Sequence, residues 1–165
     1  MITVAVDDLA ALPVDAVVRP AGESLEPAAG VATRLDQAAG DSFAEQRTVS
    51  SPLEAGAAVV TGGGNLVAPF VIHAIIRDST SPVGRAKIRR ALVSAWQQAG
   101  AWGLTRIAAP PVGVDGGGLS LEEAVALLIE TFPRDVAGET PVELCIVVER
   151  EQERVAVEAI LRRSV

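Results

Sequence analysis

A glycine-rich loop between two apolar segments holds the residues best suited to chemistry. Residues 110–124 read PPVGVDGGGLSLEEA, with four glycines between positions 113 and 118. Glycine lets backbone N–H groups come close to a ligand, and Ser120 is a good residue to begin a helix. The first turn of a helix presents unpaired N–H groups and the positive end of its dipole. The segment therefore predicts a binding place for phosphate or another anion, the alternative being a tight turn without a ligand.

Strands and helices must hold this loop, and the hydrophobic pattern predicts both. The expected strands cover residues 2–6, 14–18, 57–61, 70–76, 106–110 and 142–148, and the expected helices cover residues 30–39, 83–99, 120–132 and 149–163, with a short helix after residue 41. Apolar residues recur at intervals of three and four in the helix over 83–99, and Ser120 with Glu123 has the capping-box pattern. The alternation predicts an α/β fold, a three-layer α/β/α sandwich with a mixed, largely parallel central sheet.

Length and composition narrow the classes of protein. A chain of 165 residues is expected to form a single domain over residues 1–165. Its net charge of −7 opposes binding to a nucleic-acid backbone. The single cysteine, Cys145, excludes an internal disulfide and the usual zinc clusters. Without a basic leader or a long apolar segment, the sequence predicts a cytoplasmic protein with no membrane partner.

The ligand is expected at one edge of the sheet. Ligands of open α/β sheets bind beyond the carboxyl ends of the strands. Two glycine-containing loops fall there in the predicted order, one over residues 19–30 and the other over residues 110–120. We therefore expect the two loops to face each other across one site.

The order and spacing of short segments along nearly the whole chain are distinctive. They are Asp8 seven residues before Asp15, VDAVV at 14–18, RPAG at 19–22, AAGVA at 28–32, GAAVVT at 56–61, VIHA at 71–74 and GVDGGG at 113–118. Each segment is weak alone, but the ordered set resembles the macro domain family. The resemblance implies a macro domain fold and a pocket for ADP-ribose.

The resemblance also implies a role for each residue of the pocket. Asp8 would accept a hydrogen bond from the adenine amino group, and the backbone at Gly30, Val31 and Ala32 would meet one phosphate. The second loop would wrap the other phosphate and the distal ribose with Gly113, Val114, Asp115, Gly116, Gly117 and Gly118. Helix N-termini near Val31 and Leu121 suit a pyrophosphate.

Several positions depart from the family pattern. Gly22 stands where the family has the last Asn of Asn-x-Ala-Asn, the amide that in hydrolytic members orients the distal ribose or its attacking water. Arg19 replaces the first Asn, and Ala28 and Ala29 replace glycines. Asp115 replaces the second glycine of the second loop, and its charge would repel a pyrophosphate by about 1 kcal/mol or more at ~4 Å.

Three functions from different classes remain open. The first is a divergent macro domain that binds ADP-ribose or a related nucleotide diphosphate. The second is a hydrolase of ADP-ribosyl or O-acyl-ADP-ribose conjugates, against which Gly22 argues, and the third is a degenerate scaffold that acts through protein contacts. The ligand-binding residues of the first function are Asp8, Arg19, Gly22, Gly30–Ala32 and Gly113–Gly118. We expect no catalytic residue, no metal and no cofactor.

Four features have both a functional and a structural interpretation. Asp8 is either a purine anchor or a helix-capping residue. Arg19 either pairs with a phosphate or forms an internal pair with Asp115. His73, the only histidine, is either a general base or a structural histidine of a strand. The basic residues between positions 85 and 90 are either an anion-binding patch or a solvated helix face.

Overall fold

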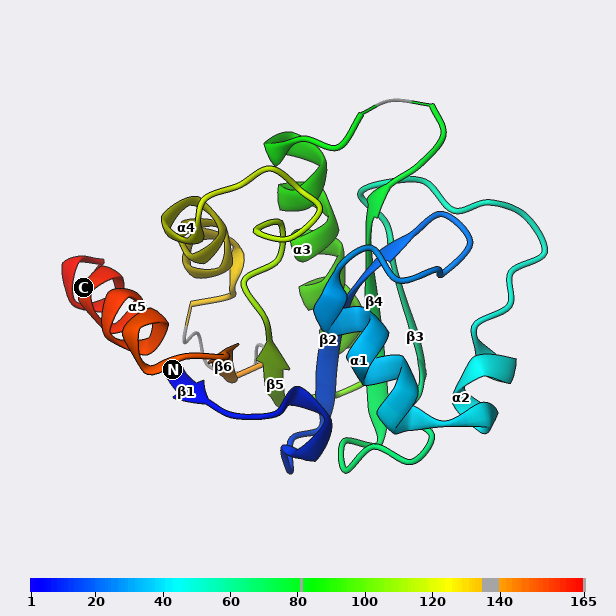
Figure 1. Cartoon of the computed structure of the whole chain (residues 1–165), viewed down its shortest axis with the longest axis horizontal. Helices are drawn as coiled ribbons and strands as arrows, with labels where there is room; N and C mark the ends of the chain where they lie inside the picture. The colour runs from blue at the N-terminus through cyan, green and yellow to red at the C-terminus, as the bar shows by residue number, and fades with distance from the viewer. Residues whose placement is uncertain (81, 135–139, 165) are drawn as a thin grey trace.

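A computed structural model describes residues 1–80, 82–134 and 140–164 and contains one central sheet (Figure 1). Its six strands lie in the order β1-β6-β5-β2-β4-β3. They are β1 Ile2–Val6, β2 Ala16–Gly22, β3 Ala58–Gly62, β4 Phe70–Arg77, β5 Arg106–Ala109 and β6 Glu143–Val148. All neighbouring pairs are parallel except β3 with β4, which is antiparallel. The predicted mixed, largely parallel sheet is confirmed.

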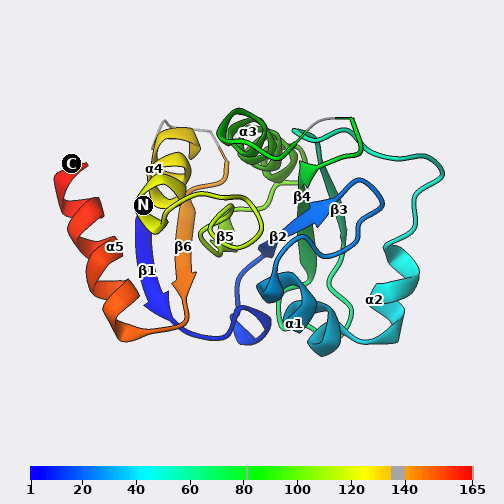
Figure 2. The ribbon, with the colours of Figure 1, turned by 45° about the horizontal axis from the view of Figure 1, so that its top comes forward.

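Helices cover both faces of the sheet, as expected for a three-layer sandwich. They are α1 Gly30–Ala39, α2 Asp41–Gln46, α3 Arg85–Ala101, α4 Leu121–Thr131 and α5 Glu151–Arg163, with the short 3-10 helix η1 Leu9–Ala11. Buried residues of α3, α4 and α5 share one apolar cluster with the sheet. Those of η1, α1 and α2 belong to a second cluster. Figure 2 shows α3 and α4 on one side of the strands and α1 on the other.

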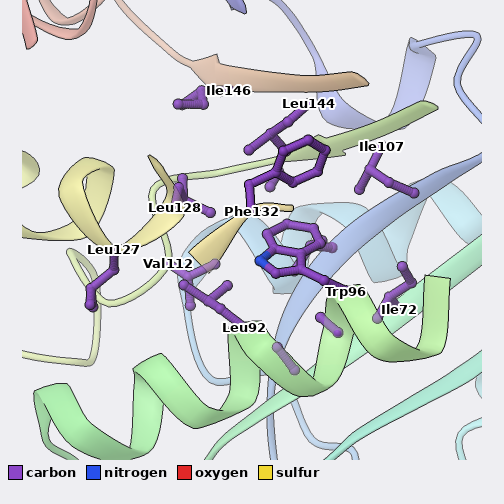
Figure 3. Close-up of a cluster of buried hydrophobic side chains, with 14 of the residues drawn as sticks. Ile72, Leu92, Trp96, Ile107, Val112, Leu127, Leu128, Phe132, Leu144 and Ile146 are labelled. Atoms are coloured by element: carbon purple, nitrogen blue, oxygen red, sulfur yellow. The ribbon is translucent and has the colours of Figure 1, made fainter. Parts of the chain in front are cut away.

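The larger cluster fixes the start of the glycine-rich loop (Figure 3). Trp96 of α3 packs edge to face on Phe132, with ring centroids 5.1 Å apart, and its indole N–H donates to Thr131 Oγ1 at 3.0 Å. Val112, which follows β5 in the chain, is only 1% exposed and belongs to the same cluster. The loop that begins at Gly113 therefore starts from a fixed point in the core.

Strand β2 is longer than the sequence predicted. We expected a strand over 14–18 that Pro20 and Gly22 would end, but β2 continues to Gly22. In this strand β2 pairs with β5 only at Ala16 and Val17, so its edge beyond Val17 is free of β5. Pro20 tolerates this position because the side toward its missing N–H has no strand to pair with. On that open side its carbonyl accepts a bond from Ala28 N at 3.1 Å, which draws the following loop back onto the strand.

Asp15 joins the beginnings of two neighbouring strands. Its Oδ2 accepts bonds from the backbone N–H groups of Thr105 and Arg106 and from Thr105 Oγ1, at 2.9–3.0 Å. These bonds, that from the Arg106 N–H first, lower the pKa of Asp15 below its usual value. Asp15 thus sets β2 beside β5, and the carboxyl ends of both strands reach the same edge of the sheet.

Candidate ligand-binding site

A cleft of about 870 Å³ lies beyond the carboxyl ends of four parallel strands, β1, β6, β5 and β2. This is the edge where the sequence placed the ligand, and the volume is typical of small-molecule sites. Its walls come from the ends of these strands and from the helices beside them: Val6–Leu9 at the end of β1, Pro20 of β2, Ala29, Val31, Arg34, Leu35 and Ala38 in and before α1, Pro110, Pro111 and Gly113–Asp115 after β5, Leu121 of α4, and Val147–Arg150 with Glu153 around the end of β6.

The structure brings only part of the predicted set into the cleft. Asp8, Val31, Gly113, Val114 and Asp115 line it. The remaining predicted residues are not among the residues that line it: Arg19, Gly22, Gly30, Ala32, Gly116, Gly117 and Gly118. Of these, Arg19 lies against Asp36 of α1 and Gly22 against Glu26.

Asp8 both caps a helix and faces the cleft. Its Oδ1 accepts a bond from Ala10 N at 3.0 Å and so caps η1. Among the described residues, Oδ2 has no hydrogen-bond partner. The neighbouring Asp7 uses its Oδ1 to accept from Asp8 N at 2.7 Å. The capping and ligand-binding interpretations of Asp8 are therefore compatible, since they use different oxygens.

Asp115 reaches across the cleft to the N-terminus of α1. Its Oδ2 accepts a bond from Gly30 N at 2.6 Å. The N-cap residue of α1, Ala29, has no side chain that could make this bond, so Asp115 supplies the cap from a loop 85 residues away. The carboxylate completes the positive end of α1 in the way that an anion would.

The glycines after Asp115 let the two loops touch. Gly116 has φ +78°, and a Cβ added there would lie 2.4 Å from the carbonyl oxygen of Ala28. Gly118 has a similar φ of +73°, but a Cβ there would meet nothing within 4 Å. Close contact between the loops, together with backbone turning, explains Gly116, whereas turning alone explains Gly118.

We predict that Gly116→Ala lowers the free energy of unfolding by about 2–3 kcal/mol and weakens ligand binding, because Cβ must push the Ala28 carbonyl away. Gly118→Ala is the matched control and is expected to cost only about 1 kcal/mol, since it adds backbone strain without a clash. Urea denaturation measures both losses. Equal losses would contradict the assignment of Gly116 to the contact between the loops.

Arg19 has a different partner from either expected one. The side chain is fully buried, and its Nε and Nη2 donate to the two carboxylate oxygens of Asp36 in α1, each at 2.7 Å. Asp36 also lies 3.4 Å from Nη1 of Arg47. The guanidinium therefore ties α1 to β2 beneath the cleft, and neither a phosphate nor Asp115 is its partner.

His73 belongs to the same buried network. Nη1 of Arg19 lies 3.2 Å from His73 Nδ1, which must accept because the guanidinium only donates. The neutral ring then carries its proton on Nε2, 2.8 Å from Thr61 Oγ1. Burial first, and the charges of Arg19 and Arg47 next, lower the pKa of His73 to about 3. The structural interpretation of His73 is thus the one the geometry supports.

Gly22 has an acidic neighbour in place of a side chain. A Cβ built on Gly22 would lie 1.8 Å from Oε1 of Glu26, so that carboxylate fills the space that a side chain at position 22 would use. Glu26 Oε1 accepts from Ser24 N at 3.3 Å, and Gly22 N donates to the Glu26 carbonyl at 2.9 Å. The loop after β2 is closed on itself at this point.

Sequence reasoning missed the wall that follows β6. Glu149, Arg150 and Glu153 line the cleft beside Asp7 and Asp8. Their place depends on β6 lying between β1 and β5, and the order of strands along the chain does not reveal this. The signal available was that every parallel strand ends at the same edge, so residues after the last predicted strand were also candidates.

Three of the four basic residues at the start of α3 have acidic partners in the described structure. Arg85 and Arg89 pair with Glu130 of α4 at 3.9 and 3.1 Å, and Lys87 pairs with Asp78 at 3.6 Å. These contacts favour the interpretation as a solvated helix face.

The chain is similar to proteins of one known family. The model of the family described as Macro domain matches residues 18–128. The chain belongs to the macro domain family. An uncharacterized protein from Aeropyrum pernix is 31% identical over 142 residues, which cover 81% of this chain and 75% of that protein. A longer Mycobacterium bovis protein is 29% identical, and the matched part spans 37% of its length.

Solved structures share the macro domain fold at low sequence identity. A Trypanosoma brucei macrodomain in complex with ADP-ribose has a TM-score of 0.83 and 22% identity, covering 97% of this chain and 68% of that one. A mutant of the Oceanobacillus iheyensis macrodomain, solved with ADPR, has a TM-score of 0.82 and 20% identity, covering 98% and 91%. At these identities the likeness establishes the fold.

The described residues show neither a membrane-spanning helix nor a cluster of metal ligands. No helix in the described residues is both long and apolar enough to cross a lipid bilayer. Within those same residues, no three His, Cys, Asp or Glu side chains gather closely enough to hold a metal ion.

Proposed function

We propose that this macro domain binds ADP-ribose or a related nucleotide diphosphate in the cleft. The observation that carries the proposal is the meeting of three predicted parts around one cleft: Asp8, the first turn of α1 and the loop Gly113–Asp115. Each part suits one portion of such a ligand. The two structural neighbours named above were themselves solved with this ligand.

The polarity of the cleft supports one orientation of the ligand. The nucleobase would lie at the β1 and β6 end, where Oδ2 of Asp8 can accept from an exocyclic amino group. The phosphates would lie toward α1, whose Val31 lines the cleft at the positive end of the helix. The apolar side chains of Leu9, Leu35 and Val148 also line the cleft and can cover the faces of a base and a ribose.

We do not propose hydrolysis. Position 22 carries no side chain, and the carboxylate of Glu26 that fills its space is not among the residues lining the cleft. A group that orients water at the distal ribose is therefore missing from the position where the family resemblance expects one.

Asp8→Asn tests the proposed base contact. The amide oxygen can still cap Ala10 N, while its NH2 group faces the cleft as a donor and repels the amino group of adenine. Isothermal titration calorimetry is expected to give about tenfold weaker ADP-ribose binding, the size of one lost hydrogen bond to a charged group.

Asp41→Asn is the control, because Asp41 is an exposed residue of α2 outside the cleft and its loss changes the net charge equally. It is expected to change affinity less than twofold. No heat with ADP-ribose or adenosine for the folded wild type would overturn the proposed function and favour the scaffold hypothesis.

A further inference from the structure

The carboxylate of Asp115 already occupies the anion position of the cleft. Its Oδ2 lies 2.6 Å from Gly30 N at the beginning of α1, a short N–H···O bond of the kind that charged acceptors make. The same oxygen would be 3.1 Å from a Cβ at Gly30, so nothing separates the carboxylate from the helix end. A ligand phosphate and this carboxylate cannot both accept from the Gly30 N–H.

The charge of the whole cleft acts in the same direction. Five carboxylates line it, those of Asp7, Asp8, Asp115, Glu149 and Glu153, against two guanidiniums, those of Arg34 and Arg150. Both arginines have acidic partners in the described structure: Arg34 pairs with Glu149 and Arg150 with Glu153. The cleft wall thus offers a second phosphate little positive charge beyond the helix end that Asp115 occupies.

We propose that Asp115 is a specificity-determining residue that limits the negative charge the cleft accepts. This inference rests on the proposed function and refines it. Asp115 acts as an internal substitute for one phosphate, so the wild-type cleft binds the diphosphate of ADP-ribose more weakly than it would without this carboxylate. Binding of a diphosphate requires the carboxylate to leave Gly30 N and to remain near a second anion in the same cleft.

Two substitutions separate charge from hydrogen bonding. Asp115→Asn removes the charge but keeps an oxygen that can accept from Gly30 N, while Asp115→Ala removes both. Asp41→Asn is the control, because Asp41 is an exposed residue of α2 outside the cleft and its loss changes the net charge equally. Calorimetry with ADP-ribose and with adenosine measures binding for the wild type and the three variants.

We expect Asp115→Asn to bind ADP-ribose about tenfold more tightly than the wild type, and Asp115→Ala at least as tightly as Asp115→Asn. Adenosine affinity is expected to stay within about twofold in every variant, and Asp41→Asn to match the wild type. The gain for ADP-ribose is expected to shrink as salt is added, because salt screens the repulsion that the variants remove.

Other outcomes overturn the inference in distinguishable ways. If the wild type binds ADP-ribose and the Asp115 variants bind it equally or more weakly, Asp115 is not a competitor and the proposed function survives. If neither the wild type nor any variant binds either ligand, the proposed function fails and the inference with it. The Gly30 amide resonance in ¹⁵N spectra gives a separate readout: it is expected to move in Asp115→Ala without ligand, and an unmoved resonance would refute the Asp115–Gly30 bond.

Discussion

Replacing Asp36 with Asn is expected to lower the free energy of unfolding by about 3–5 kcal/mol, the usual cost of leaving one charge of a buried pair unbalanced. Arg19 has no exposed surface, and both of its bonds to Asp36 are 2.7 Å long. An Asn would keep the shape but would lose the charge and one of the two acceptor oxygens. Arg19 would then face Arg47 without the carboxylate that lies between them.

Urea denaturation at neutral pH measures this loss. Glu130→Gln is the control, because it breaks ion pairs with Arg85 and Arg89 that are largely exposed, and such pairs contribute about 0–1 kcal/mol. The double substitution Arg19→Met with Asp36→Leu is expected to recover part of the stability, since it leaves no buried charge at position 19 unbalanced, although Arg47 still loses its carboxylate partner. A loss below about 1 kcal/mol for Asp36→Asn would contradict the role given to this pair.

Local hydrophobic spacing predicts most of this fold, whereas contacts between distant segments could not be predicted. Most helices and strands were predicted because hydrophobic spacing is a local property, and α1 and β1 match their expected bounds. The end of β2 was not predicted. Whether Pro20 fits in β2 depends on where β5 stops pairing with it, and that depends on the arrangement of the whole sheet. The partner of Arg19 likewise depends on which face of α1 meets β2.

The candidate site divides in the same way. Asp8 and the loop from Gly113 were predicted from spacing and family resemblance, and both line the cleft. The bond from Gly30 N to Asp115 joins residues 85 positions apart, whereas the sequence analysis expected Asp115 either to repel a ligand or to pair with Arg19. The acidic wall after β6 required the strand order. Long-range packing, rather than any motif, therefore decides how the cleft is charged.

Lowering the pH from 6.5 toward 3 is expected to remove up to about 5 kcal/mol of stability through His73 alone, at 1.36 kcal/mol per pKa unit. The folded-state pKa of His73 is lowered to about 3 from its usual 6.5, because the ring is buried and faces Arg19 and Arg47. Below pH 6.5 the unfolded chain binds a proton that the folded protein does not, so acid favours unfolding. Above pH 6.5 both states are neutral at this residue and the contribution is complete.

The pH window from about 5 to 6.5 isolates this histidine, because most carboxylates titrate below it. Urea denaturation at intervals of half a pH unit is expected to give a slope near 1.4 kcal/mol per unit at the acid end of that window. His73→Gln removes the titrating ring but keeps a polar side chain between Arg19 and Thr61, so this variant is expected to be less stable at pH 7 yet nearly independent of pH here. An equal slope in wild type and His73→Gln would show that another group titrates. It would also contradict the structural, neutral role of His73 and reopen its interpretation as a general base.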